Sequence, residues 1–256
     1  MSFSRIDLEA TIAPFIDLGL ISEVVEPIKS GKEGTVYRCR ATAASGHEHA
    51  ALKVYRPRAR RTFKNDARYL EGRPAHRVGG GNTREARALC GGTRFGRRVQ
   101  ESTWTAREWE VLQRLYDAGL PVPQPLHATD HAILMELCVD GEGGVAPPLA
   151  SASLSAELAV SLFHAVCADV ETMLWVDVLH ADLSPYNILW SGEDYRIIDF
   201  PQAVDPRFNQ NALSFLQRDL ENVGRFCARF GAIPDVRTVA NEVWRRFQHG
   251  EHGAVS

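Results

Sequence analysis

The sequence predicts an α+β protein with two lobes: a small, mainly β amino-terminal lobe with one key helix, and a larger, mainly helical carboxy-terminal lobe. Two observations lead to this prediction. Apolar residues alternate in short runs between residues 28 and 55, as in strands, but recur at helical spacing in residues 155–178 and 211–230. The boundaries that we expect are an amino-terminal helical segment at 1–24, a first lobe at 25–137 and a second lobe at 138–256.

Length and composition set the outer bounds. The 256 residues suffice for two lobes with a hydrophobic core, and 45% hydrophobic with 24% charged residues is typical of a globular protein. We find no apolar run approaching the roughly 20 residues that span a bilayer, and no signal peptide at the amino terminus. The five cysteines are scattered and never form a C-x-x-C pair, which argues against disulfides and zinc. We therefore expect a cytoplasmic protein with no membrane partner.

The first elements are a helix and a hairpin. Residues 5–20 have apolar positions at helical spacing, with Pro14 expected to kink or divide the helix. Residues 28–40 form two alternating runs around a turn that contains Gly31 and Gly34. Glycines let main-chain N–H groups approach a phosphate closely, although the same glycines fit any hairpin turn.

A strand with a single lysine follows at residues 50–55. Lys53 stands among apolar residues, as in the V-A-I-K strand whose lysine binds nucleotide phosphates. The alternative is a lysine whose stem packs on the sheet while its amine reaches solvent.

The next segment is strongly basic. Between residues 56 and 98 there are thirteen Lys or Arg against three acids, in a chain whose net charge is −3. We expect a long loop over residues 56–103, with one short helical turn near 63–70. It is either a docking surface for an anionic partner or solvated disorder.

A clear helix follows at residues 103–119, ending at Gly119. Glu108 shares its apolar face, and a carboxylate on an inward face needs a partner. Lys53 is the candidate that we expect; an exposed surface glutamate is the alternative.

Proline-rich residues 121–125 predict an extended connector, followed by a buried strand at 132–138 and a glycine-containing linker. We expect this linker to be the hinge between the lobes, with the backbone around Glu136 and Cys138 facing an adenine edge. Helices are predicted at 155–178 and 211–230, and a last one runs from Asp235 to Phe247.

Three polar residues stand between the first two of these helices with a spacing that suits phosphoryl transfer. Asp182 and Asn187 fit the pattern H-x-D-x-x-x-x-N, and Asp199 ends a strand after a Gly-containing turn. One carboxylate can orient an attacking hydroxyl, while an amide oxygen and a second carboxylate hold a divalent metal on the phosphates.

With these residues placed, the chain resembles a RIO-type atypical serine/threonine protein kinase, in a short, bacterial-like form. Many ordered motifs over residues 25–230 carry the resemblance. They include Ser30-Gly31-Lys32-Glu33, Lys53-Val54-Tyr55, Phe63-Lys64, Glu108, Met135-Glu136, His180-Ala181-Asp182, Tyr186-Asn187-Ile188, Ile197-Ile198-Asp199 and Arg218-Asp219.

The resemblance implies a bilobal kinase fold, ATP with Mg²⁺ or Mn²⁺, and phosphorylation of serine on a protein or on the chain itself. It implies that Asp182 is the catalytic base and that Asn187 and Asp199 are metal ligands. It implies that Lys53 and Glu108 form the ion pair. The residues implied for nucleotide binding are Ser30, Gly31 and Lys32 in the phosphate loop and Met135, Glu136 and Cys138 in the hinge. It also implies that Asp199 can accept phosphate as an aspartyl-phosphate in an ATPase cycle.

Two other functions remain open. One is a small-molecule phosphotransferase of the aminoglycoside or choline kinase type, which shares the core of polar residues. The other is an ATP-gated protein that binds RNA or a ribosomal particle through residues 56–98. Two departures from the family are also visible: Gly34 replaces the usual Ala or Ser, which we expect to loosen the phosphate loop, and no Ala-Pro-Glu element follows Asp199.

Overall fold

The computed structural model describes residues 5–31, 33–56 and 94–251, with side chains from residue 8 and, in the helix that begins at residue 94, from residue 104. These residues divide into two compact units. The first unit comprises the described residues up to Arg56, the helix α4 (Arg94–Asp117) as far as Gln113, and Pro123–Cys138. The second comprises Arg114–Val122 and the chain from Val139 onward.

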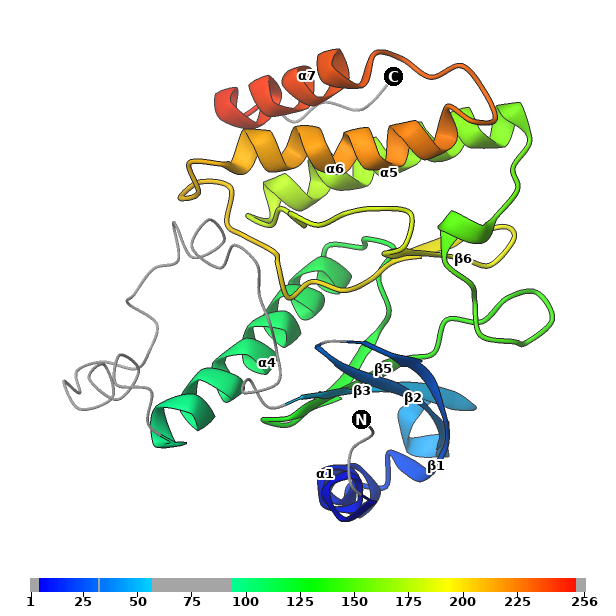
Figure 1. The fold of residues 1–256 in the computed structure, drawn as a ribbon, viewed down its shortest axis with the longest axis vertical. Coiled ribbons are helices and arrows are strands. Elements are labelled where there is room, and N and C mark those ends of the chain that lie inside the picture. Colours follow the sequence, from blue (N-terminus) through cyan, green and yellow to red (C-terminus); the bar gives the residue numbers. More distant parts are fainter. Residues whose placement is uncertain (1–4, 32, 57–93, 252–256) are drawn as a thin grey trace. The chain divides into compact units, whose positions relative to one another are not determined.

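The first unit is built on an antiparallel sheet of five strands. They lie in the order β1-β2-β3-β5-β4 (Figure 1), with bounds β1 (Ile21–Ser30), β2 (Gly34–Ala41), β3 (His49–Tyr55), β4 (Pro125–Ala128) and β5 (Ala132–Glu136). The helix α1 (Arg5–Asp17) precedes them, and the short helix η1 (Ala43–Ser45) connects β2 to β3. The predicted hairpin and lysine-bearing strand are therefore confirmed.

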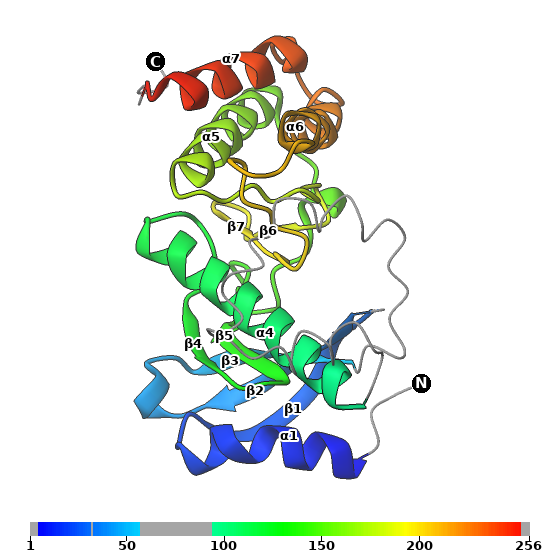
Figure 2. The same ribbon diagram turned by 90° about the vertical axis from the view of Figure 1, so that its left-hand side faces the viewer.

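Alternation along β3 sends its side chains to two different surroundings. Leu52 and Val54 join Phe15 of α1 in a fully buried apolar cluster. Lys53 and Tyr55 point the other way and contact Glu108 of α4. Figure 2 shows α1 and α4 on opposite faces of the sheet. Because both faces of β3 are covered, this strand can hold a charged group in a dry environment.

One local prediction for this part of the chain was wrong. The segment predicted as a loop to residue 103 is helical from Arg94, in a stretch that lacks an apolar period. The helix α1 continues through Pro14 and is not divided there. The connector predicted as extended leads into a short strand, β4, which pairs with β5. The helical turn expected near residues 63–70 lies outside the described residues.

The second unit is mainly helical. It contains α5 (Ala156–Trp175), α6 (Ala212–Cys227) and α7 (Val236–His249), which pack against one another, together with η4 (Leu149–Ser151) and the two-stranded hairpin of β6 (Ile188–Trp190) and β7 (Tyr195–Ile197). Ser155 and Asp235 cap the first turns of α5 and α7 with their side-chain oxygens, as these residue types commonly do. The three predicted helices are confirmed.

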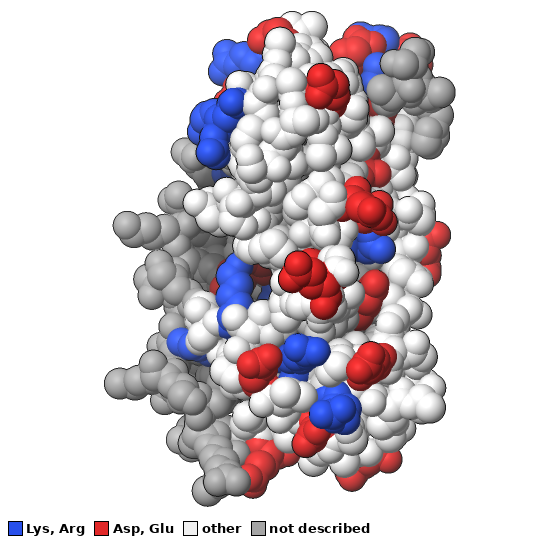
Figure 3. All heavy atoms as spheres, turned by 90° about the vertical axis from the view of Figure 1, so that its right-hand side faces the viewer, with Lys and Arg blue, Asp and Glu red and all other residues white. Residues whose placement is uncertain are grey.

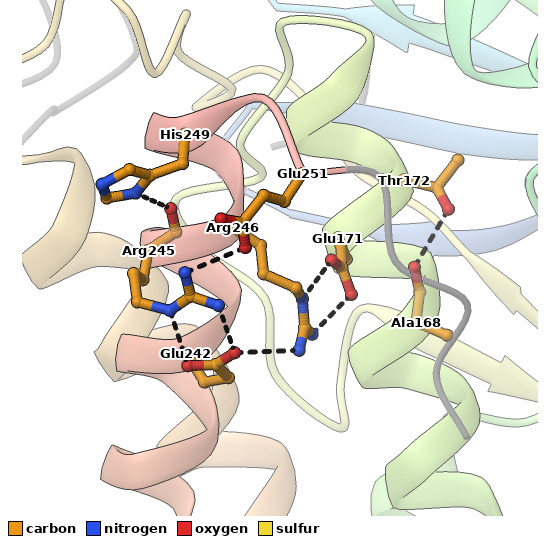
Figure 4. A network of polar contacts seen from close by, with 8 residues as sticks. All are labelled: Ala168, Glu171, Thr172, Glu242, Arg245, Arg246, His249 and Glu251. Atoms are coloured by element: carbon orange, nitrogen blue, oxygen red, sulfur yellow. Dashed lines mark hydrogen bonds and ion pairs between the residues drawn. The ribbon is translucent and has the colours of Figure 1, made fainter.

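The helix α5 is, among the described residues, the one helix long and apolar enough to cross a membrane by length and composition, so the expectation of no such run was wrong. Half of that stretch is buried within the structure, and core helices of globular proteins satisfy the same criterion. A buried acid lies on it: Glu171 accepts two hydrogen bonds from Arg246 of α7, at 2.7 and 2.8 Å (Figure 4). These contacts join α5 to α7 within the second unit.

Candidate active site

In the first unit, Lys53 and Glu108 form a buried ion pair. The Nζ atom of Lys53 lies 2.7 Å from Oε1 of Glu108, and the two residues are only 9% and 5% exposed. Leu112 and Leu115 follow Glu108 on the buried face of α4, which places the carboxylate toward β3. Removing either partner of a buried pair leaves an uncompensated charge, so the two side chains hold each other in place.

A third residue, which the sequence motifs did not single out as part of the site, completes this group. Tyr55 donates its hydroxyl to Oε2 of Glu108 over 2.6 Å. Its ring also lies beside the lysine, with Nζ of Lys53 5.2 Å from the ring centroid. Both oxygens of Glu108 are therefore engaged by side chains of β3.

The turn between β1 and β2 is the predicted phosphate loop. The Gly31 amide donates to the carbonyl of Gly34 over 2.9 Å and closes the turn. The Ser30 hydroxyl lies 3.2 Å from that of Thr35 and accepts from Arg56 over 2.8 Å. Lys32 lies outside the described residues. The described contacts of this turn are therefore contacts within the protein.

Gly34 has a structural explanation that corrects our expectation of a looser loop. A Cβ atom at this position would lie 2.3 Å from the carbonyl oxygen of Val54 on the neighbouring strand. Contacts that short do not occur, so the residue allows β2 and β3 to approach each other closely. Gly34 tightens the base of the turn.

The predicted hinge residues lie at the end of β5 and just beyond it. Met135 and Glu136 are the last residues of the strand, and Cys138 is buried. The Glu136 amide donates to the carbonyl of Gln124, and its carboxylate accepts from the Gln124 amide at 3.0 Å. Glu136 therefore joins the end of β5 to Gln124 through two hydrogen bonds.

In the second unit, Asp182 lies on a loop with an unusual backbone. Ala181, the residue before it, has φ of 60°, in the left-handed region that non-glycine residues rarely adopt. Asp199 itself has φ of 74°. Such conformations persist only where the surroundings impose them, and they concentrate at functional sites.

Hydrogen bonds connect the segments that carry Asp182, Asn187 and Asp199. The Asn187 side-chain amide donates to the Asp182 main-chain oxygen over 2.9 Å. The Ile198 amide, next to Asp199, donates to the Asn187 carbonyl over 2.9 Å. The buried His180 contacts the Ile198 carbonyl through Nε2 at 3.1 Å. The structure therefore brings together the three residues predicted from the motif.

The charge environment of Asp182 suits a group that accepts a proton. Although the residue reaches solvent, partial desolvation raises the pKa of its carboxyl, and the like charge of Asp199 raises it further. The guanidinium of Arg218 acts in the opposite direction and lowers this pKa. A carboxylate whose pKa is raised by its site is a stronger base than one in water.

Three polar side chains of helix α6 form hydrogen bonds with the main chain of the loop around Asp182. Arg218 donates to the Ala181 carbonyl, and Asn222 donates to the Leu183 carbonyl over 3.0 Å. Asp219 is 1% exposed and accepts from the Leu183 amide. The sequence motifs marked Arg218 and Asp219 only as part of a family pattern and did not include Asn222. The available signal was an aspartate, Asp219, among the apolar residues of the buried face of an amphipathic helix.

The donors present fit a hard divalent cation. Asn187 and Asp199 offer an amide oxygen and a carboxylate from adjacent segments, and Mg²⁺ is commonly held by one or two such groups together with phosphate oxygens and water. Within the described residues, no three His, Cys, Asp or Glu side chains cluster as a metal site would require.

Comparison with known protein families gives a consistent answer. A family model described as the RIO domain matches residues 35–239. The serine/threonine-protein kinase rio1 of Schizosaccharomyces pombe is 31% identical over 218 residues, which are 85% of this chain and 40% of that protein. The chain thus spans less than half the length of this curated relative. The RIO-type serine/threonine-protein kinase Rio2 of Methanocaldococcus jannaschii is 30% identical over 221 residues, 86% of this chain and 73% of that one.

Solved structures share the fold. The Rio2 kinase of Chaetomium thermophilum, crystallised as an ADP/Mg²⁺-phosphoaspartate complex, matches with a TM-score of 0.62 and 20% identity over 98% of this chain and 78% of that chain. The predicted α+β class is confirmed, with an antiparallel sheet in the first unit and helices in the second.

Proposed function

This chain belongs to the RIO domain family, and we propose that it is an ATP-dependent kinase that phosphorylates serine or threonine on a protein substrate or on itself. The observation that carries the proposal is the hydrogen-bonded connection of Asp182, Asn187 and Asp199 within the second unit. The match to residues 35–239 also favours a protein kinase over a small-molecule phosphotransferase.

The proposed chemistry assigns a task to each group. Asp182 accepts the proton of the attacking hydroxyl, whose oxygen forms a bond to the γ-phosphorus as the bond to the β-phosphate oxygen breaks and ADP leaves. Lys53, held by Glu108, binds phosphate oxygens. Asn187 and Asp199 would hold Mg²⁺ or Mn²⁺, which neutralises charge on the phosphates when bound.

The remaining site residues are proposed to hold the nucleotide. Ser30, Gly31 and Lys32 would bind phosphate, and the backbone near Met135, Glu136 and Cys138 would bind adenine. The closed turn from Gly31 to Gly34 and the hydrogen-bonded end of β5 support these roles, because both give fixed main-chain geometry.

The experiment that tests the proposal is transfer of phosphate from labelled ATP with Mg²⁺ to the protein itself and to a generic protein substrate. Asp182→Ala is expected to lose transfer by at least about 100-fold while retaining ATP binding, because the base acts in the chemical step. Asp194→Ala, in an exposed turn of the same unit, is the matched control and should keep full activity. Transfer by Asp182→Ala at the normal rate would contradict the proposal.

A second activity is supported by one observation. The structural relative from Chaetomium thermophilum was crystallised with a phosphoaspartate, and Asp199 here has a constrained backbone. We propose that an oxygen of Asp199 can attack the γ-phosphorus, releasing ADP, and that water then hydrolyses the acyl phosphate. Hydroxylamine cleaves acyl phosphates but leaves phosphoserine intact. A label that resists hydroxylamine in full would contradict the ATPase cycle while leaving the kinase proposal in place.

Binding to RNA or a ribosomal particle remains a proposal based on residues 56–98, of which the structure describes the side chain of Arg56 alone. On the face shown in Figure 3, Lys and Arg side chains of the described residues are interspersed with Asp and Glu and form no extensive field of one sign. Support for an anionic partner comes from the thirteen Lys or Arg residues between 56 and 98. RNA affinity should fall steeply with salt; affinity that does not change with ionic strength would contradict this proposal.

A further inference from the structure

We propose that Tyr55 is a positioning residue for phosphoryl transfer, because its hydroxyl fixes the Glu108 carboxylate that in turn fixes Lys53. This inference rests on the proposed function and deepens it. It concerns how the phosphate-binding lysine is held ready before any nucleotide binds.

The three side chains are joined by direct hydrogen bonds. Oε1 of Glu108 accepts from Lys53 over 2.7 Å, and Oε2 accepts from Tyr55 over 2.6 Å. Lys53 and Tyr55 are two residues apart on β3, so they lie on the same face of the sheet. One strand thus supplies a separate donor for each oxygen of a carboxylate on α4.

Burial makes the second donor important. Glu108 is 5% exposed and Tyr55 is 6% exposed, so water does not readily replace a missing partner for either oxygen. With only one of these two donors, the carboxylate could rotate about χ3, a torsion angle whose observed distribution is broad in glutamate. With two donors in fixed positions, that rotation breaks a hydrogen bond to a charged group, one of the stronger classes of hydrogen bond in proteins. The Tyr55 hydroxyl therefore satisfies one carboxylate oxygen of Glu108 and also fixes the orientation of the carboxylate.

The ring of Tyr55 adds a second restraint on the lysine. Nζ of Lys53 lies 5.2 Å from the ring centroid, within the range of a cation–π contact. The ammonium is held from one side by Glu108 and from another by the ring. The lysine is therefore restrained both by a carboxylate on α4 and by a ring on its own strand.

The test compares two substitutions that each remove one buried hydroxyl from the same sheet. Tyr55→Phe keeps the ring and loses the hydrogen bond to Glu108. Tyr37→Phe is the matched control, because Tyr37 is 7% exposed in the apolar cluster on the opposite, α1-covered face. Tyr55→Phe should lower kcat/KM for ATP by roughly tenfold, as expected when a catalytic group is misplaced, and Tyr37→Phe should leave it unchanged.

Two further measurements separate positioning from loss of structure. Hydrogen exchange without nucleotide should rise in residues 104–113 of α4 for Tyr55→Phe and stay unchanged for Tyr37→Phe. In a Glu108→Ala background, Tyr55→Phe should cause no further loss of kcat/KM, because the carboxylate through which it acts is gone.

The outcomes distinguish this inference from the proposed function. If the wild-type protein transfers phosphate but Tyr55→Phe changes neither kcat/KM nor exchange in α4, the role of Tyr55 is wrong. The same conclusion follows if the loss persists in full without Glu108. If exchange responds as expected but the wild-type protein neither binds ATP nor transfers phosphate, the positioning of Glu108 stands and the proposed function is wrong.

Discussion

The side-chain amide of Asn187 donates to the main-chain oxygen of Asp182 over 2.9 Å, so the residue proposed as a metal ligand also holds the loop of the proposed base. Asn suits this position because its amide has a donor half and an acceptor half. An aspartate of the same shape has two acceptors and cannot make the hydrogen bond to Asp182.

Asn187→Asp therefore tests whether this hydrogen bond matters apart from metal binding. We expect kcat to fall by about 100-fold, because the loop loses a donor that orients the reacting groups. Raising the concentration of Mg²⁺ should not restore activity, since the ligand oxygen is retained. Steady-state kinetics across a Mg²⁺ titration measure this, and full recovery at high Mg²⁺ would show that Asn187 acts through the metal alone.

Gly34→Ala tests the close approach of β2 to β3. The added Cβ would meet the Val54 carbonyl at 2.3 Å, so the strands must separate. We expect a loss of roughly 1–3 kcal/mol in the free energy of unfolding, typical of overpacking, and weaker ATP binding. Gly31→Ala is the control, because a Cβ there would lie 3.9 Å from its nearest neighbour. Equal effects of the two substitutions in urea unfolding would contradict the steric explanation.

Asp219 predicts a dependence of stability on pH. Burial raises the pKa of its carboxyl from 3.8 to about 7 in the folded protein, while Arg218 and the Leu183 amide oppose this increase. Between pH 4 and 7 the unfolded chain releases this proton and the folded protein keeps it. The contribution of Asp219 to stability therefore falls as pH rises through this window, by about 1.4 kcal/mol for each pH unit, and is constant above it.

The neutral variant Asp219→Asn should remove that decline, so its stability relative to the wild-type protein should increase from pH 4 to 7. Urea unfolding at several pH values measures it. Asp169→Asn serves as a comparison, because burial raises the pKa of Asp169 to about 6, and its effect should end at a lower pH. A wild-type slope in Asp219→Asn would show that this carboxyl does not titrate as inferred.

The ion pair of Arg246 and Glu171 predicts how α7 is attached to α5. Glu171 is 3% exposed and is held by two hydrogen bonds from Arg246 (Figure 4). Arg246→Leu should lower the free energy of unfolding by about 3 kcal/mol, because it leaves a buried charge without its partner. Replacing both residues by leucine should recover most of this loss.

Arg245 is the matched control for that experiment. It pairs with Glu242 and Glu251 on the same helix surface, but these side chains are about half exposed. Exposed pairs contribute little because solvent screens them. Arg245→Leu should therefore leave stability unchanged, and a loss as large as that of Arg246→Leu would contradict the assignment of the anchoring role to the buried pair.

Local sequence was a good guide to the catalytic segment and to most elements. Asp182 and Asn187 are five residues apart on one loop, and Asp199 follows Asn187 by twelve residues, after the hairpin of β6 and β7. Chemistry confined to such a short stretch is visible as a motif. The hairpin of β1 and β2 and the helices α5, α6 and α7 were likewise predicted, because each has its own apolar period and turn residues.

Patterns failed where one element depends on another far along the chain. The start of α4 at Arg94 has no apolar period to mark it, and β4 forms because β5 supplies its hydrogen bonds. The sequence around Gly34 suggested a flexible loop residue, whereas the Val54 carbonyl beside it requires a residue without a Cβ. The loop around Asp182 is held by Arg218 and Asn222, which follow it by more than thirty residues.

The sequence by itself thus determined the α+β class and most of the elements, and it supplied the groups proposed for phosphoryl transfer, since these depend on residue type and short spacing. Only the tertiary structure decided how those groups are held. The contacts of Tyr55 with Glu108 and of Arg218 with Ala181 join residues 53 and 37 positions apart. Such contacts arise when buried polar groups must find partners in the folded chain, and no local pattern records which partner each one finds.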